Sequence, residues 1–258
     1  MRTIVRQIFG VFLILISFGS LIVLMVVGIY NNEHARSEVR SYYSTDISST
    51  ELQKAHEYND SLYKDHSNID TYDATLNFGE GALGVLRIPK MDIEYVIYHG
   101  VRDEVLNDYV GHIPSSLLPI GDKGVSVLTA HNGIPGKPLF TDLDLLENGD
   151  TFTVTIDKTP TTYQVFKRQI LPVEDVQIYL ERSEASPVID LMTCYPFGAN
   201  THRLIVSGKL IDLQETQFPV RQANVPRKAT LPYYLFIGLG LFCLMLCLII
   251  LIRRMRHV

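Results

Sequence analysis

Hydrophobic residues form two long uncharged runs, one near each end of the chain. The runs are Ile8–Ile29 and Leu231–Ile252, each 22 residues long. Because a helix needs about 20 apolar residues to cross the hydrocarbon core of a bilayer, each run predicts a transmembrane helix. A cleaved signal peptide is the alternative for the first run, but it would have a shorter apolar core and a small-residue cleavage site. Tyr30-Asn31-Asn32 offers no such site, so we expect a retained anchor.

Between the runs, the pattern first follows a helical period. Ser48 and Glu51 have the spacing of a capping box, in which each side chain binds the other residue's backbone N–H. Apolar residues then recur at helical spacing, namely Leu52, Ala55, Tyr58 or Asn59, and Leu62. This stripe predicts a helix that packs on the main domain. Ser67–Glu80 has no clear periodicity and predicts a loop.

From Ala82 onward the pattern changes to short β-rich segments separated by Pro and Gly turns. Thr151–Ile156 alternates strictly between polar and apolar residues, which predicts a strand with one buried face. Pro138–Leu146 predicts a short helix. The other predicted strands are Leu83–Ile88, Ile93–Tyr98, Ser126–Ala130, Thr162–Leu171, Val188–Cys194 and Arg203–Ile211. So many short strands favour a β-barrel or a β-sandwich.

The distribution of charge predicts how the chain lies across a membrane. Residues 31–230 hold all 28 acidic and 18 of the 23 basic residues, whereas the two ends hold five arginines and no acid. Basic residues stay on the cytoplasmic side, so we expect a cell-membrane protein with both termini in the cytoplasm and residues 31–230 outside. The net charge of −10 in that segment provides no large basic surface, which argues against nucleic acid as a partner.

The three cysteines differ in their surroundings. Cys243 and Cys247 lie inside the second hydrophobic run, where packing in lipid is the simplest interpretation. Cys194 stands alone in the exported segment, at the end of an apolar run and before a turn-forming stretch. Burial in a β-core is the commonest fate of a free cysteine. A strand end beside a loop is also where a scaffold presents a reactive group, which makes Cys194 a candidate nucleophile.

A cysteine nucleophile acts as the thiolate and needs a proton acceptor or a cation nearby. His131, His202 and Arg203 are the candidates. Adjacent residues of a strand face opposite sides, so only one of His202 and Arg203 can face Cys194. If Arg203 faces the thiol, the base must be His131. A fixed guanidinium could then stabilise the negative charge that develops in acyl transfer.

Several blocks together resemble one enzyme family, the sortases. Leu191-Met192-Thr193-Cys194 is similar to the TLxTC signature, with Asp190 where that signature has Thr. Thr129-Ala130-His131 and Asn200-Thr201-His202-Arg203-Leu204 agree with the same family. The longer blocks resemble the pilus-assembling class C sortases: Ile88-Pro89-Lys90, Pro138–Asp144, Gly149-Asp150-Thr151-Phe152, and Cys194–Arg203. The resemblance covers about residues 50–212.

The resemblance implies a mainly β fold, an eight-stranded sortase-type barrel with short helices. It further implies a transpeptidase in which Cys194 attacks the Thr–Gly bond of an LPxTG-like sorting motif in a pilin precursor and forms a thioacyl enzyme. His131 would serve as general acid and then as base, and Arg203 would hold the substrate or the oxyanion. A lysine of another pilin would accept the acyl group. We also expect Thr193 and Thr129 to contact the substrate.

These inferences predict five segments along the chain. They are residues 1–30, the N-terminal anchor; 31–80, a helical and lid segment; 81–213, the catalytic barrel; 214–230, a linker; and 231–258, a C-terminal transmembrane helix with a basic tail.

Class C sortases carry a lid with an Asp-Pro-aromatic tripeptide, and this chain departs from that pattern. Asp70-Thr71-Tyr72 has the acid and the aromatic ring at the right spacing but lacks the proline. We expect Asp70 to pair with Arg203 and Tyr72 to cover Cys194, in a lid that holds loosely because the loop without proline loses more entropy on docking. A linker with a chance Asp-x-Tyr is the alternative.

Two other functions stay open at this point. The same acyl enzyme could transfer surface proteins to a peptidoglycan amine or lipid II instead of polymerising pilins. A membrane-held assembly or binding module with an inert Cys194 is a non-enzymatic alternative. The sequence shows no clustered metal-ligand spacing, and we predict no required cofactor.

Overall fold

The computed structural model describes residues 2–45, 49–64, 72–76, 81–180 and 184–211. The chain divides into two compact units, of which the larger is Asn31–Val225. Of the described residues, the smaller unit includes those of the first hydrophobic run, up to Tyr30.

The first element is a single long helix, α1 (Arg2–Ser44). By length and composition it is the one helix among the described residues suited to cross a membrane, in its segment Phe12–Ser44. The second predicted span, Leu231–Ile252, lies outside the described residues. Near the C-terminal end of α1, Ala35, Val39 and Tyr42 are buried. Their spacing of three to four residues gives the helix one apolar side.

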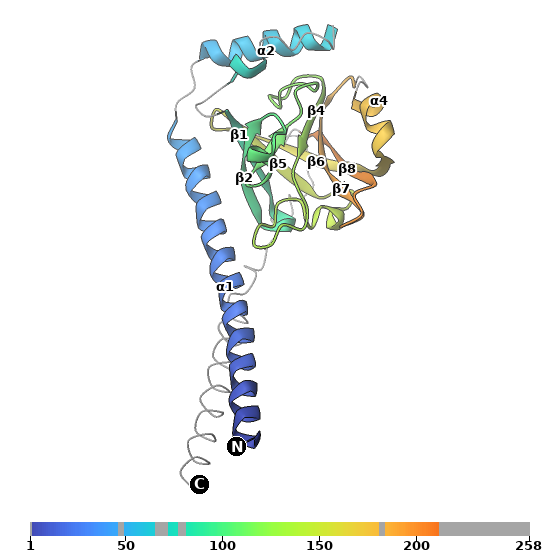
Figure 1. Ribbon diagram of the computed structural model, residues 1–258. Helices are drawn as coiled ribbons and strands as arrows, with labels where there is room; N and C mark the ends of the chain where they lie inside the picture. Colours follow the sequence, from blue (N-terminus) through green and yellow to red (C-terminus); the bar gives the residue numbers. More distant parts are fainter. Residues whose placement is uncertain (1, 46–48, 65–71, 77–80, 181–183, 212–258) are drawn as a thin grey trace. The chain divides into compact units, whose positions relative to one another are not determined.

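Eight strands close into one barrel in the order β1-β2-β3-β4-β7-β8-β6-β5 (Figure 1). The strands are β1 (Ala82–Ile88), β2 (Ile93–His99), β3 (Val110–His112), β4 (Gly124–Thr129), β5 (Thr151–Ile156), β6 (Thr159–Pro172), β7 (Pro187–Tyr195) and β8 (His202–Leu210). The prediction of an eight-stranded barrel is therefore confirmed. Most neighbours are antiparallel, but β2 pairs with β3 and β4 pairs with β7 in parallel. The parallel pairing of β4 and β7 brings their C-terminal ends to the same edge of the barrel.

Helix α2 (Ser49–Lys64) and the 3-10 helix η1 (Tyr72–Ala74) precede the first strand. Short helices connect later strands, namely α3 (Asp103–Leu106) and α4 (Val176–Leu180), with the 3-10 helices η2 (Pro89–Met91), η3 (Leu143–Leu145) and η4 (Val173–Asp175). The helix predicted over Pro138–Leu146 is wrong except for the three residues of η3. Leu139 has a φ of 42°, a left-handed conformation that a right-handed helix cannot contain. Its side chain is fully buried, so packing of the loop overrides the local helical pattern.

Aromatic and aliphatic side chains from inside the barrel form the main core. Phe152 and Tyr163, on the paired strands β5 and β6, stack with ring centroids 5.6 Å apart. Gly208 on β8 faces these rings, because a Cβ atom there would lie 2.4 Å from Cε1 of Phe152. The glycine thus makes room for the largest rings of the core.

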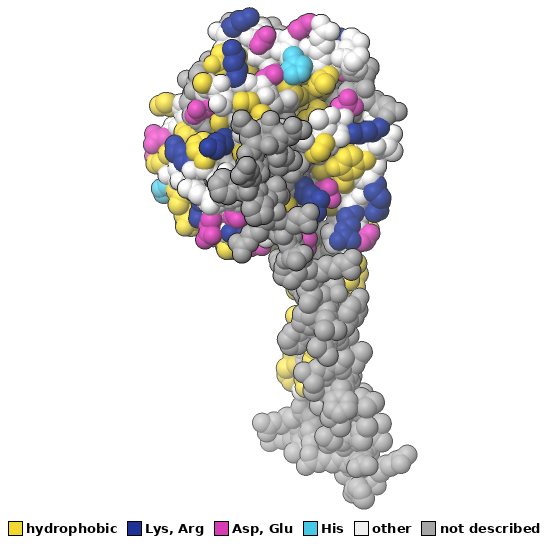
Figure 2. All heavy atoms as spheres, turned by 180° about the vertical axis from the view of Figure 1, so that it is seen from behind, with side chains coloured by type: hydrophobic (Ala, Val, Ile, Leu, Met, Phe, Trp, Pro, Cys, Tyr) yellow, Lys and Arg dark blue, Asp and Glu magenta, His cyan; other side chains and the backbone are white. Residues whose placement is uncertain are grey.

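On the outside, acidic and basic side chains are interspersed over the face shown in Figure 2, so the negative charge is not gathered there.

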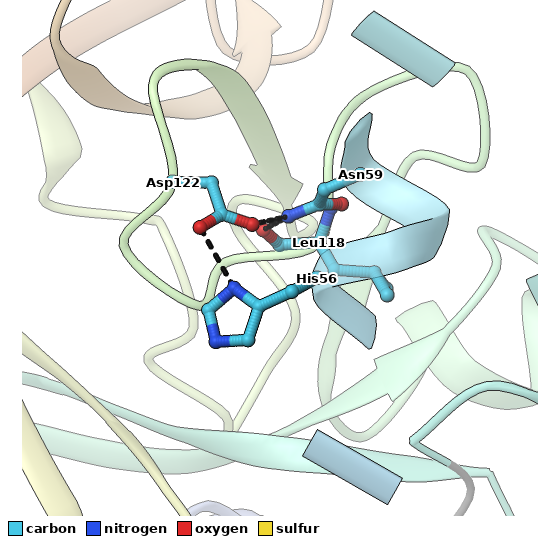
Figure 3. A network of polar contacts seen from close by, with 4 residues as sticks. All are labelled: His56, Asn59, Leu118 and Asp122. Atoms are coloured by element: carbon cyan, nitrogen blue, oxygen red, sulfur yellow. Dashed lines mark hydrogen bonds and ion pairs between the residues drawn. The ribbon is translucent and has the colours of Figure 1, made fainter. Parts of the chain in front are cut away.

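Helix α2 packs on the barrel through the stripe that the sequence predicted. Ala55, Tyr58, Asn59 and Leu62 are its buried residues. The Asn59 amide binds both backbone groups of Leu118, since Nδ2 donates to its O atom at 3.0 Å and Oδ1 accepts from its N–H at 2.8 Å. Nδ2 also donates to Asp122 at 3.0 Å, and Asp122 binds Nδ1 of His56 at 2.8 Å (Figure 3). This network fixes α2 to the connection between β3 and β4.

Candidate functional site

Cys194 and Arg203 are direct partners in the antiparallel pair of β7 and β8. Side chains of opposed residues lie on the same face, with Cβ atoms about 4.5–5.5 Å apart. Both residues are half-buried, and Cys194 is the one cysteine that the described part of the chain contains. His202 is opposed to Tyr195 instead and contacts the hydroxyl of Thr201 at 2.8 Å. The pairing therefore selects Arg203 over His202 as the neighbour of the thiol.

The guanidinium of Arg203 is held by the turn between β7 and β8. Its Nη1 donates to the carbonyl of Asn200 at 3.2 Å and to the carbonyl of His202 at 3.0 Å. A guanidinium carries five N–H donors, so these two contacts leave donors for a further acceptor. The turn thus orients a cation whose neighbour across the ladder is the thiol.

His131 follows the C-terminal end of β4, which runs parallel to β7. Thr129 is opposed to Met192, and two further residues along each chain lead to His131 and Cys194. Neighbouring strands lie about 4.8 Å apart, so the register brings the imidazole residue level with the thiol residue. The backbone carbonyl of His131 accepts a hydrogen bond from the N–H of Phe140 at 3.0 Å. This bond holds His131 to the loop that follows β4. The structure thus gathers His131, Cys194 and Arg203 at one end of the barrel.

The two threonines predicted to contact substrate instead join β4 to β7. Thr129 Oγ1 donates to the carbonyl of Met192 at 3.0 Å, and Thr193 Oγ1 donates to the carbonyl of Ala130 at 2.8 Å. Thr193 is only 3% exposed. Both hydroxyls hold the strands that carry the candidate site, a role different from the predicted contact with substrate.

Tyr72, in η1, is buried against His99 and His112, which lie on β2 and β3. Its hydroxyl contacts Nδ1 of His112 at 2.8 Å and accepts from the N–H of Gly100 at 3.1 Å. By register, His112 is opposed to Leu128, and Leu128 is opposed to Leu191, three residues before Cys194. This buried position differs from the cover over Cys194 that the sequence predicted. Asp70 lies outside the described residues, so its pairing with Arg203 stays a prediction.

Burial changes the pKa of the groups around Tyr72. It lowers the pKa of His112 to about 3, although the contact with the carbonyl of Leu117 opposes the shift. Burial also lowers the pKa of His99, whose ring meets the ring of Tyr72 at a centroid distance of 4.6 Å. Both histidines are therefore neutral at pH 7. His112 acts as a hydrogen-bonding group through both ring nitrogens, and His99 packs against the ring of Tyr72.

Two neighbours of the site carried no signal in the sequence pattern. Asn132 Nδ2 donates to the carbonyl of Cys194 at 2.7 Å. The ring of Phe197 lies so close to Gly133 that a Cβ atom there would be 1.7 Å from ring Cε2. An asparagine and a glycine after His131 look like an ordinary turn, and only the tertiary structure shows that this turn meets the loop after Cys194.

No group of three or more His, Cys, Asp or Glu side chains suited to hold a metal occurs among the described residues. The arrangement instead combines a thiol, an imidazole and a guanidinium. These groups are suited to nucleophilic attack, proton transfer and stabilisation of an oxyanion.

Comparison with known proteins identifies relatives with this barrel. The family described as "Sortase domain" matches residues 86–211. Sortase D of Bacillus subtilis is 32% identical over 133 residues, which are 50% of this chain and 64% of that protein. The match therefore spans somewhat less than two thirds of the curated relative.

Solved structures cover more of the chain. Sortase C of Clostridium perfringens with the C-terminal cell wall sorting motif has a TM-score of 0.62 and 32% identity, over 69% of this chain and 100% of that one. Sortase C1 of Streptococcus agalactiae has a TM-score of 0.61 and 30% identity, over 70% and 98% of the two chains. The similarity therefore includes essentially the whole of each solved domain.

Proposed function

Since this chain belongs to the sortase family, and its structural neighbours are mostly class C sortases, we propose that it is a membrane-anchored cysteine transpeptidase that polymerises pilins. The observation that carries this proposal is the direct opposition of Cys194 and Arg203, with His131 brought level by the neighbouring strand.

In the first step, Cys194 forms the acyl enzyme. Sγ attacks the carbonyl carbon of the Thr–Gly bond in an LPxTG-like motif, and the C–N bond breaks to leave a thioester. The leaving amine takes a proton from His131. Because a thiolate is the attacking species, the imidazolium and the thiolate must be present together before attack.

In the second step, an amine replaces the thiol. A lysine ε-amine of another pilin attacks the thioester carbonyl, loses a proton to His131, and expels the thiolate of Cys194. One amide bond has then been broken and one isopeptide bond formed, so no outside energy source is required. The two roles of His131 follow from the opposite proton demands of the two steps.

Arg203 acts on the oxygen of the carbonyl group in both steps. Each tetrahedral intermediate carries negative charge on that oxygen, and a donor held in place beforehand stabilises it without reorganisation. The contacts of Nη1 with Asn200 and His202 hold the guanidinium in this way.

The family and the sequence support a substrate class and a membrane topology for this enzyme. The C. perfringens relative was solved with a C-terminal cell wall sorting motif, which supports a motif of this kind as the acyl donor here. Helix α1 would anchor the enzyme, and Leu231–Ile252 would add a second span with both termini in the cytoplasm. Such an arrangement keeps the barrel at the outer membrane surface, where pilin precursors with their own hydrophobic anchors emerge.

Intact mass spectrometry of the full chain in detergent micelles tests this proposal. We expect incubation with an LPxTG-type peptide to add the mass of its acyl half to the native protein and to leave Cys194→Ala unchanged. A pilin peptide with a lysine should then release the adduct faster than a peptidoglycan-type amine. The reverse preference would indicate wall anchoring. No adduct with several motif variants would reject the enzyme in favour of an assembly module.

A further inference from the structure

The backbone ladder between β4 and β7 stops just before the candidate site. Its last backbone bond there runs from the N–H of Ala130 to the carbonyl of Met192, at 3.3 Å. In a parallel ladder, alternate residues of one strand donate to alternate carbonyls of the next at even spacing. The next bond would therefore run from the N–H of residue 132 to the carbonyl of Cys194.

A side chain makes that bond instead. Nδ2 of Asn132 donates to the carbonyl of Cys194 at 2.7 Å. The backbone turns away at Gly133, which has a φ of 72° and whose N–H donates to Oγ1 of Thr141 at 2.9 Å. The amide of Asn132 thus extends the ladder by one step while the main chain leaves the sheet.

This bond constrains the nucleophile from one side while β8 constrains it from the other. The carbonyl of Cys194 belongs to the peptide group that joins the last two residues of β7, so a donor on this carbonyl fixes the orientation of that group. Arg203 opposes the same residue on β8. Reacting atoms need placement to within a fraction of an ångström for full rate. A free strand end would not provide it.

We propose that Asn132 is a positioning residue for Cys194. Its side chain links the turn that follows His131 to the nucleophile. The inference rests on the proposed function, because it assigns Asn132 to the same reaction. The residue acts only through Cys194. The role requires a donor, since aspartate of the same shape would direct a carboxylate oxygen at a carbonyl oxygen.

The test compares Asn132→Ala and Asn132→Asp with Thr141→Val in the full chain. Thr141→Val removes the acceptor of Gly133 on the same turn but does not touch Cys194. We expect both Asn132 variants to lower kcat for acylation about 10- to 100-fold with little change in KM. Thr141→Val should stay within about threefold of the native rate, because the nucleophile keeps its donor.

The second readout is independent of any peptide substrate. The rate constant of Cys194 alkylation by iodoacetamide is measured at one fixed pH, and a thiol whose strand end has lost its donor should react at a rate different from that of the native protein. A native alkylation rate in both Asn132 variants would overturn the inference. If the native protein forms no acyl adduct, the proposed function fails, while the alkylation rate still decides the role of Asn132. Should Asn132→Ala not fold, Asn132→Asp keeps the shape of the side chain and supplies the result.

Discussion

Cys194 and Arg203 oppose each other across β7 and β8, and the turn that joins the two strands holds the guanidinium. One hairpin thus supplies both the nucleophile and the cation of the site. Their relative position depends on local strand pairing, which persists as long as the hairpin does. His131 comes from another part of the barrel, so the closure of β4 against β7 is what completes the site.

The geometry of Arg203 predicts that lysine cannot replace it. A lysine has one compact charged group, which cannot both bind the turn carbonyls and present a fixed planar donor. We expect Arg203→Lys to lower kcat for acylation by about 100-fold, the usual loss for one oxyanion donor. Single-turnover acylation of the full chain measures it. Arg87→Lys, on an exposed position of β1, is the matched control, and a native rate for Arg203→Lys would reject the role.

The attachment of α2 gives a prediction about stability. Asn59→Ala leaves both backbone groups of Leu118 without their amide partner in a buried position (Figure 3). Unsatisfied buried groups of this kind cost about 1–3 kcal/mol each, so we expect the free energy of unfolding to fall by about 2 kcal/mol or more. Far-UV circular dichroism during urea denaturation measures this change.

His56→Ala serves as the comparison for Asn59→Ala. Its ring binds the same Asp122 but has a side chain 48% exposed, and an exposed pair contributes less than about 1 kcal/mol. Equal losses in the two variants would show that the buried amide is not the main attachment.

Much of the barrel was predictable because its strands obey local rules. The alternation in Thr151–Ile156 and the turn before Ile93 each arise from neighbouring residues, and both strands appear where expected. The three-residue strand β3 was missed, since Val110–His112 is too short to show a period and exists only through its neighbours β2 and β4. The helix predicted at Pro138–Leu146 failed for the converse reason, because buried packing set its backbone.

The site likewise has features that local patterns predict and features that only the tertiary structure reveals. Strand alternation left a choice between His202 and Arg203, and the register of β7 with β8 resolved it. The spacing of a lid motif predicted that Tyr72 covers Cys194. In the structure its hydroxyl instead contacts the imidazole of His112 and the backbone N–H of Gly100. The contact of Asn132 with Cys194 joins segments 62 residues apart. No local pattern encodes such a contact.

The packing of Phe197 on Gly133 predicts non-additive effects. Gly133→Ala places a Cβ within 1.7 Å of the ring and also strains a φ of 72°. The ring is 71% exposed, so it can move aside and take the loop after Cys194 with it. We expect Gly133→Ala to slow acylation more than Phe197→Ala does.

In Gly133→Ala/Phe197→Ala the clash is gone but the strain remains. The double variant should therefore recover part of the acylation rate lost in Gly133→Ala. Its free energy of unfolding should stay about 1 kcal/mol below that of the native chain, which is the cost of an alanine in a left-handed conformation. Simple addition of the two single effects would show that the ring and the turn are not coupled.

The buried histidines predict a loss of stability in acid. Burial lowers the pKa of His112 from 6.5 to about 3, and it lowers the pKa of His99 as well. Below pH 6.5 these two imidazoles bind protons in the unfolded chain but stay neutral in the folded chain. The free energy of unfolding therefore has its full value above about pH 6.5. Because of His112 it falls as the pH drops from there toward 3, by up to about 1.4 kcal/mol per pH unit. The lowered pKa of His99 acts in the same direction.

Replacement of His112 measures how much this histidine contributes to the change of the free energy of unfolding with pH. His112→Gln keeps hydrogen-bonding groups but cannot take up a proton, so we expect its stability to change less steeply between pH 6.5 and pH 4 than that of the native chain. Tyr72→Phe is the control, because it removes the hydroxyl partner of His112 and leaves the histidine in place. Urea denaturation followed by circular dichroism suits a chain without tryptophan. Parallel pH profiles for His112→Gln and the native chain would mean that His112 is protonated in the folded state and does not drive the acid sensitivity.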